Sequence, residues 1–254
     1  MTSSVSPGVV EPGASSDGLG LHGTVPELPP QVGRSFPEPD IWLRLRQVRQ
    51  RPGHALDTLL ALARGQYYKL KFRLLGRRFR AGKHFRVYNR LFVEGPGEVV
   101  LGDYVLCERN VSLFTHSPRA RLIIGHKVNM GGTQFGCVRE INIRDNTVLA
   151  DANIMDSDFH SIFPNRRSPE APVRVKPVDI GPNAWICGRV AVLAGTRVGE
   201  NSVVGYGAVC ARSYPANSII VGNPAKVVGS IPADPSERTS KNPDEWITQH
   251  DMAR

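Results

Sequence analysis

A histidine follows two carboxylates in one short stretch of the chain. Asp156, Asp158 and His160 occupy every second position. Histidine changes charge near neutral pH, so a positioned imidazole can remove a proton from a hydroxyl group, an effect typically worth ~10²–10⁴ in rate. A neighbouring carboxylate can fix the tautomer of such a ring, and Asp158 is the nearer candidate. These residues predict general-base chemistry, with His160 as the base and Asp158 as its partner.

A second polar motif lies near the end of the patterned part of the chain. Its residues are Gly222, Asn223, Pro224, Ala225 and Lys226. Proline restricts the backbone there, and the lysine presents a cation of the kind that binds phosphate groups. We therefore expect Lys226 to contact an anionic ligand.

The chain around these two motifs has a sequence pattern that repeats every six residues. Between positions 180 and 210 every sixth residue is apolar: Ile180, Ile186, Val192, Val198, Val204 and Cys210. This period is neither helical nor the alternation of a half-exposed strand. Each hexad is typical of a short strand with a sharp corner, and three hexads form one 18-residue turn. Stacked turns would pair at the ~4.8 Å strand spacing.

The same phase continues toward the N-terminus in three sets of three. These are Leu101, Cys107 and Leu113; Ile124, Met130 and Gly136; and Ile143, Leu149 and Met155. The gaps between the sets predict a short loop near 117–121 and a long loop that begins after Met155 and contains His160. About five turns are expected between positions 99 and 228, in an all-β domain.

The hexads, the Asp-x-Asp-Phe-His stretch and the Gly-Asn-Pro-Ala-Lys stretch together resemble the hexapeptide-repeat acetyltransferases. The closest groups are the maltose and galactoside O-acetyltransferases and the polysaccharide O-acetyltransferases. The resemblance covers about 87–229 and implies a left-handed parallel β-helix, an exception to the usual crossover handedness. It also implies acetyl-CoA as co-substrate, His160 as the catalytic histidine because it lies 17 residues after Ile143, and Lys226 on the coenzyme A side.

Further site residues are implied by this resemblance. The pantetheine groove of relatives corresponds to Gly188, Tyr206, Ala211 and Arg212, where Tyr206 departs from the usual alanine or glycine. A homotrimer with sites between neighbouring subunits is implied, and Trp185 would face the neighbouring subunit or the acyl chain. Relatives also carry a polar residue from an earlier turn that helps to hold the tetrahedral intermediate. Three candidates remain open: Asn129, Thr133 and Gln134.

Metal binding and disulfide formation are not expected. One branch of the resembled family binds metal through three histidines, but among His116, His126 and His160 only the last falls at a recognised position. The four cysteines contain no Cys-x-x-Cys pair, and Cys107 and Cys210 occupy inward hexad positions. We therefore expect a reducing compartment, no zinc site and no other metal.

Charge and composition divide the 254 residues into four segments. We expect a disordered Pro/Gly/Ser-rich tail over 1–39, a basic helical segment over 40–82, the β-helix over 83–230 and a C-terminal tail over 231–254. Between Arg34 and Arg90 there are 15 basic and three acidic residues, which gives this region a net charge of +12. Because the whole chain has a net charge of +9, the remaining residues sum to −3. No secretory signal or apolar run of 18 residues is present, which favours a cytoplasmic protein.

The basic segment is expected to be helical over 41–50 and 54–80. Its apolar stripe comprises Leu56, Leu59, Leu60, Ala63, Tyr67, Leu70, Leu74 and Phe79. One interpretation packs this stripe against the β-helix as a cap. The other places residues 41–80 on an anionic membrane at its inner face. Nucleic acid is not an expected partner, because no binding module surrounds the arginines.

The favoured function is acetyl-CoA-dependent O-acetylation of a saccharide or glycan hydroxyl. Arg166, Arg167 and Arg174 of the long loop could contact an acidic acceptor. One alternative is N-acetylation of an amino sugar. Another is a non-catalytic trimeric scaffold that uses the basic helix as an anchor, and such a protein would ignore coenzyme A.

Overall fold

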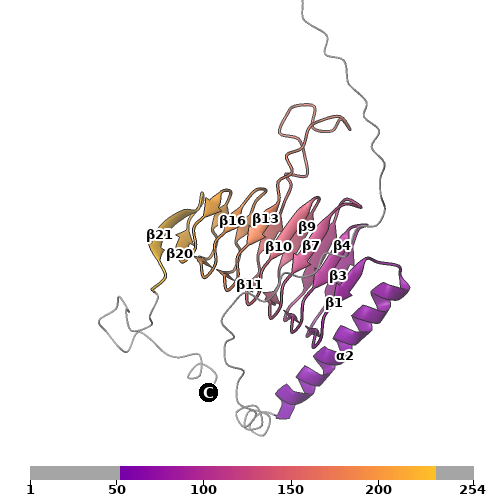
Figure 1. Ribbon diagram of the computed structural model, residues 1–254. Coiled ribbons are helices and arrows are strands. Elements are labelled where there is room, and N and C mark those ends of the chain that lie inside the picture. The colour runs from indigo at the N-terminus through magenta and orange to yellow at the C-terminus, as the bar shows by residue number, and fades with distance from the viewer. Residues whose placement is uncertain (1–51, 233–254) are drawn as a thin grey trace, which may run out of the picture.

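The computed structural model describes residues 52–232, in which one helix leads into a parallel β-solenoid (Figure 1). The expected tail over 1–39, the helix over 41–50 and most of the C-terminal tail lie outside the described residues. No helix within 52–232 is both long enough and apolar enough to cross a bilayer.

Three sheets of stacked strands form the sides of the solenoid. The first sheet contains β1 (Phe79–Ala81), β4 (Glu98–Leu101), β7 (Arg121–Ile124), β10 (Glu140–Ile143), β13 (Val178–Ile180), β16 (Arg197–Val198) and β19 (Ser213–Tyr214). The second contains β2 (Arg86–Val87), β5 (Leu106–Cys107), β8 (Asn129–Gly131), β11 (Val148–Ala150), β14 (Trp185–Ile186), β17 (Val203–Val204), β20 (Ser218–Val221) and the antiparallel β21 (Lys226–Ser230). The third contains β3 (Leu91–Glu94), β6 (Val111–Thr115), β9 (Gln134–Cys137), β12 (Asn153–Met155), β15 (Ala191–Val192) and β18 (Val209–Cys210).

The solenoid has about seven turns, as the seven strands of the first sheet show, rather than the five expected. One additional turn precedes position 99 and begins with β1, which pairs with β4. The other is the last turn, where Val198 pairs with Tyr214, only 16 residues further along the chain. This shortened turn breaks the 18-residue spacing, so the hexad pattern could not reveal it.

The inward positions of the hexads form the core. All six residues at the predicted inward hexad positions from Ile180 to Cys210 are buried, which confirms the predicted phase there. In the third sheet, however, Phe135 and Ile154 are the inward residues, and the prediction of Gly136 and Met155 is wrong by one position. The corner before each strand is one residue shorter than expected. This register buries a phenylalanine and an isoleucine instead of a glycine and a more exposed methionine.

One corner of the solenoid requires a left-handed backbone in successive turns. Asn183, Asn201 and Asn217 have φ angles of 56°, 55° and 56°. Asparagine tolerates this conformation better than most residues. The side-chain amide of Asn183 donates to Asn201 at 2.9 Å, and that of Asn201 donates to Asn217 at 3.1 Å. These amides therefore form a ladder along the corner between the first and second sheets.

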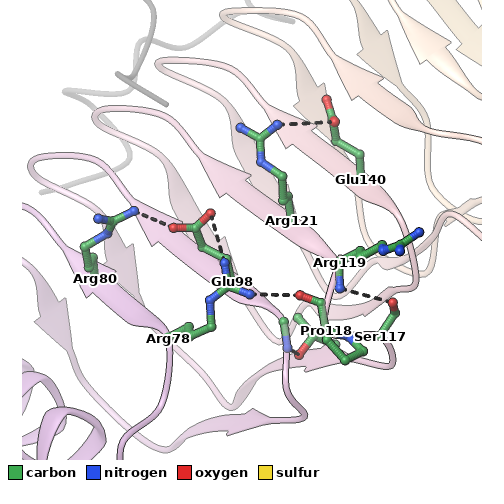
Figure 2. A network of polar contacts seen from close by, with 10 residues as sticks. Arg78, Arg80, Glu98, Ser117, Pro118, Arg119, Arg121 and Glu140 are labelled. Carbon is green, nitrogen blue, oxygen red and sulfur yellow. Dashed lines mark hydrogen bonds and ion pairs between the residues drawn. The ribbon is translucent and has the colours of Figure 1, made fainter. Parts of the chain in front are cut away.

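Charged residues link neighbouring turns on the outer face of the first sheet. Figure 2 shows Arg80 and Arg78 at the carboxylate of Glu98, and Arg121 facing Glu140 at 3.8 Å. Arg78 also donates to the carbonyl oxygen of Pro118 at 2.8 Å. Such exposed pairs contribute little to stability individually, about 0–1 kcal/mol.

The single described helix, α2 (Pro52–Leu74), covers the open end of the first turn (Figure 1). Its buried face contains Ala61, Gly65 and Phe72, and the Phe72 ring lies 5.1 Å from that of Phe79. The helix ends before Gly76, whose φ is +64°, and the chain then enters β1. The predicted extension to residue 80 is therefore wrong, and Phe79 belongs to the β-solenoid.

The expectation that the leucine-rich stripe of α2 packs against the solenoid is also wrong. Its leucines and Tyr67 are exposed, whereas the opposite face forms the cap. A Cβ at Gly65 would lie 2.1 Å from the carbonyl oxygen of Phe85, so the helix backbone approaches the solenoid too closely for a larger residue. Gly65 stands at the point of closest approach, Tyr68 and Phe72 pack on the same face, and the leucines remain outside.

Candidate functional site

The candidate site lies on the outer face of the third sheet. A cavity of about 260 Å³ opens there, where three successive turns meet the base of the long loop 156–177. Its lining combines aromatic rings, two amides and an imidazole: Phe114, His116, Gln134, Phe135, Gly136, Asn153, Met155 and Phe159. The residues come from β6, β9, β12 and adjoining loops, so stacking of the turns creates the cavity.

Asp156 fixes the start of the long loop. Its fully buried carboxylate accepts hydrogen bonds of 2.7 Å from the backbone N–H groups of Val138, Arg139 and Glu140. These charge-assisted bonds offset the cost of removing the carboxylate from water. Burial raises the pKa of the adjacent Cys137 thiol, and the charge of Asp156 raises it further. Asp156 therefore ties the loop to the preceding turn, a role that its place beside Met155 in the sequence did not reveal.

The two ends of the long loop meet in an antiparallel neck. The backbone N–H of Asp158 donates to Arg174 at 3.1 Å, and that of Lys176 donates to Asp156 at 2.8 Å. Ser157 also forms an isolated antiparallel bridge with Val175. The loop is thus closed at its base, and His160 lies just beyond this neck.

The carboxylate of Asp158 is engaged by Arg174. The two form a bidentate pair, with nitrogen–oxygen distances of 2.9 and 3.0 Å, which raises the pKa of the Arg174 guanidinium. The sequence predicts that Asp158 orients His160. The structure supplies another partner for this carboxylate, while the backbone N–H of His160 donates to the Asp158 carbonyl oxygen at 2.7 Å. Arg166 and Arg167 lie further out in the loop and are exposed.

Phe159 lines the cavity together with His116, and His160 is the next residue but is not part of the lining. The Phe159 ring meets His116 edge to face at 4.8 Å between centroids, and a Cβ at Gly136 would lie 2.6 Å from the ring. Phe159 has a φ of +57°, which is uncommon for a bulky residue. His160 follows immediately and is exposed. The contact between Phe159 and His116 could not be predicted from the sequence, although both residues stand near loop ends.

The three candidates for the residue that helps to hold the tetrahedral intermediate occupy different environments. Asn129 lies on β8 of the second sheet and its amide donates to Glu108 at 2.9 Å. Thr133 is fully buried at a corner. Gln134 lies on β9 and lines the same cavity as Phe159. Asn153, which sequence reasoning did not single out, pairs with Gln134 in the next turn and also lines the cavity.

The residues expected to line a cofactor groove lie around the last strands of the third sheet. Gly188 and Tyr206 occupy equivalent corners before β15 and β18, and a Cβ at Gly188 would lie 3.1 Å from the Tyr206 ring. That ring is exposed. Ala211 and Arg212 directly follow β18 and are also exposed. The four residues therefore flank β15 and β18 from two corners.

Lys226 lies close to this region because the chain folds back after β20. The backbone N–H of Ala225 donates to Val209 of β18 at 2.9 Å, and the Tyr214 hydroxyl donates to the carbonyl oxygen of Ala225 at 3.3 Å. Lys226 follows as the first residue of β21 and is exposed. The Asn223–Pro224 peptide bond in the preceding turn is cis.

The remaining groups do not form an additional centre within the described part of the chain. All four cysteines have free thiols, and burial raises the pKa of Cys107 to about 12 and that of Cys210 to about 11. Among residues 52–232, no three His, Cys, Asp or Glu side chains lie together in a way that could hold a metal ion.

Comparison with known proteins gives similarities over parts of the chain. No family model matches it. A protein of Staphylococcus aureus (strain COL), provisionally named an acetyltransferase, is 52% identical over 62 residues, which is 24% of this chain and 31% of that protein. A Dictyostelium discoideum protein with the same provisional description is 38% identical over 122 residues, covering 45% of this chain and 64% of its own length. The chain therefore spans about a third of the length of the former relative.

Among solved structures, one similarity is to a hexapeptide-repeat acetyltransferase of Vibrio cholerae complexed with acetyl coenzyme A. The alignment has a TM-score of 0.45 and 20% sequence identity, and it covers 74% of this chain and 90% of that chain.

Proposed function

We propose that this chain transfers an acetyl group from acetyl-CoA to a hydroxyl group of a saccharide. The observation that carries the reaction class is the 52% identity over 62 residues to a provisionally named acetyltransferase. The site supports the proposal because Phe159 lines a polar and aromatic cavity and the next residue, His160, is exposed, and an imidazole beside such a cavity is suited to activate a hydroxyl group.

His160 acts as the general base in the proposed reaction. Its neutral imidazole takes the proton of the acceptor hydroxyl as that oxygen attacks the carbonyl carbon of the thioester. The carbon–sulfur bond then breaks, and the imidazolium returns the proton to the departing sulfur. Gln134 and Asn153 line the cavity and carry amide N–H groups that can donate to the oxygen on which negative charge develops.

The residues around β15 and β18 are suited to hold acetyl-CoA. Lys226 presents an exposed cation for its phosphate groups, and Arg212 presents another. Gly188 and Ala211 are small enough to let an extended pantetheine arm lie close to the backbone. Tyr206 covers Gly188, so the arm would pass beside that ring.

A saccharide is favoured as the acceptor by the lining of the cavity. The rings of Phe114 and Phe159 can contact the apolar face of a sugar, whereas Gln134, Asn153 and His116 can bond its hydroxyl groups. A cavity of about 260 Å³ is near the lower end of ligand-site volumes, which fits one sugar unit better than a longer segment.

A homotrimer is proposed because the candidate site is open and because apolar side chains are exposed on the outer face of the solenoid. Val148 and Trp185 are neighbours in register on the outer face of the second sheet, and both are exposed. A neighbouring subunit could cover this surface and exclude water from the exposed His160. Sedimentation that showed a fully active monomer would remove the inter-subunit site from the proposal.

The discriminating experiment measures release of the coenzyme A thiol with purified protein and acetyl-CoA. Saccharides that carry only hydroxyl groups are compared with amino sugars, and the products are analysed by mass spectrometry. O-acetylated product supports the proposal. Transfer to amines alone would instead establish the N-acetyltransferase, and a protein that neither binds nor consumes acetyl-CoA would be the non-catalytic scaffold.

A further inference from the structure

The helix α2 has two apolar faces on opposite sides. The capping face, Ala61, Gly65, Tyr68 and Phe72, is in contact with the solenoid. The outward face consists of Leu56, Leu59, Leu60, Tyr67, Leu70 and Leu74, which are 45–78% exposed. At about 100° per residue the mean directions of the two sets lie roughly 155° apart. The second apolar face therefore cannot be explained by packing within the described chain.

Cations stand on both flanks of the outward face. Arg64 and Lys71 lie on one flank, and Lys69 and Arg73 on the other, by the same helical geometry. Asp57 is the sole acidic residue among positions 52–74, which gives four cations against one acid and a net charge of +3. Lysine and arginine side chains can lie along an apolar surface while their charges reach a polar boundary.

Two of these cations also hold the helix in place. Arg64 donates to the carbonyl oxygen of Tyr88 at 2.6 Å, and Lys69 donates to that of Gly82 at 2.6 Å. The carbonyl groups do not neutralise the charges of Arg64 and Lys69. By contrast, Arg78 and Arg80, which follow the helix in the chain, are paired with the carboxylate of Glu98 (Figure 2). Arg64 and Lys69 therefore reach toward the solenoid, and the exposed Lys71 and Arg73 supply the positive charge beside the outward face.

We propose that the outward face of α2 binds peripherally to an anionic phospholipid bilayer. An apolar stripe between cationic flanks matches the boundary between acyl chains and negatively charged headgroups. From Leu56 to Leu74 the stripe is about 27 Å long at ~1.5 Å per residue, so the helix would lie parallel to the surface. The capping face keeps the helix on the end of the solenoid formed by the first turn (Figure 1).

A second copy of the chain fits the outward face less well. Two identical helices packed through this face would bring their cationic flanks together, and like charges oppose such a contact. An anionic surface satisfies both the leucines and the cations. The proposal is independent of acetyl transfer, because it concerns a helix at the other end of the molecule from Lys226 and β21.

The experiment measures binding of the full chain to vesicles. The probes are vesicles of phosphatidylcholine and phosphatidylglycerol in a ratio of about 3:1, with pure phosphatidylcholine vesicles for comparison. We expect binding to the anionic vesicles at low salt that weakens severalfold as NaCl approaches about 0.5 M, because salt screens the cations. Deletion of the helix is unsuitable as a test because it would also remove the cap.

Point substitutions separate the outward face from the cap. The triple variant Leu59→Ser, Leu70→Ser and Leu74→Ser should reduce vesicle partitioning by about tenfold or more. Ile162→Ser is the matched control, because Ile162 is as exposed as Leu74, 78%, but lies in the long loop. The control should bind as the unaltered chain does. Thermal unfolding of both variants should match that of the unaltered chain, because all four side chains are exposed.

Several results would overturn the proposal. These are the absence of binding by the unaltered chain at low salt, equal binding by the triple variant, or equal binding to neutral vesicles. A lower molecular mass of the triple variant in sedimentation would identify a second copy as the occupant. Binding that appears only after removal of residues 1–51 would show that the chain covers this face itself.

Discussion

The carboxylate of Asp158 meets the guanidinium of Arg174 in a bidentate pair across the neck of the long loop, with distances of 2.9 and 3.0 Å. The backbone N–H of Asp158 also donates to the Arg174 carbonyl oxygen at 3.1 Å. The two residues therefore hold each other through both main chain and side chain. This pair positions the loop just before the exposed His160.

Removal of this pair should reduce turnover less than removal of His160. Asp158→Asn and Arg174→Gln should have similar, moderate effects on kcat, because each loosens the same neck without removing a proton acceptor. The partly exposed pair contributes about 0.2–1 kcal/mol to stability. A double-mutant cycle on kcat and on the free energy of unfolding measures their coupling. If Asp158→Asn alone is as damaging as His160→Ala, Asp158 acts on the imidazole directly.

His160→Ala should lower kcat by about 10²-fold or more while the affinity for coenzyme A stays nearly unchanged, because a general base acts on the acceptor in the transition state. Single-turnover kinetics and calorimetric titration with coenzyme A provide the two measurements. His126→Ala is the control, since His126 accepts a hydrogen bond from the Asp103 backbone at a solenoid corner. Retention of full turnover by His160→Ala, under conditions where chemistry limits the rate, would exclude the proposed base.

Lys226→Ala should show the converse pattern. The dissociation constant of coenzyme A should rise about tenfold, because one charge contact with phosphate is lost, while kcat at saturating acetyl-CoA changes little. Dephospho-coenzyme A, which lacks one phosphate group, tests whether that group is the contact. Lys127→Ala, at a left-handed corner of an early turn, serves as the control. An unchanged affinity in Lys226→Ala would place the phosphates elsewhere.

Asp156→Ala should destabilise the fold by about 3 kcal/mol or more, because three backbone N–H groups lose a buried acceptor. Denaturant unfolding measures this loss. Glu170→Ala, in the exposed part of the same loop, is the control and should leave stability nearly unchanged. A stable Asp156→Ala protein would mean that water replaces the carboxylate at little cost.

Gly65→Ala should destabilise the cap, whereas Gly53→Ala should not. The added Cβ at position 65 would lie 2.1 Å from the Phe85 carbonyl oxygen, and at position 53 it would meet no atom within 4 Å. Both glycines lie in α2, where replacement of glycine by alanine gains about 0.5–1 kcal/mol in helix propensity. Only position 53, which has no steric conflict, can realise this gain in full. Thermal unfolding should show a lower Tm only for Gly65→Ala. Equal behaviour of the two variants would contradict the close packing of α2.

The solenoid core could be predicted from the sequence because its pattern is local. Each inward residue from Ile180 to Val204 is covered by equivalent residues in the turns above and below, so a period of six is sufficient to identify it. The two loops also follow directly from interruptions of this period, as confirmed at 116–120 and 156–177. General-base chemistry could also be proposed from the sequence, because Asp156, Asp158 and His160 lie together where the long loop interrupts the repeat.

Corner lengths and contacts between turns depend on how the turns pack against one another, which no local sequence pattern encodes. Phe135 and Ile154, rather than their neighbours, enter the core because packing between turns selects the larger buried side chains. The capping face of α2 is likewise selected by the close approach at Gly65, although the leucine stripe is the stronger periodic signal. Gln134, Asn153 and Phe159 share a cavity because stacking joins separate turns, and no spacing along one turn encodes that contact.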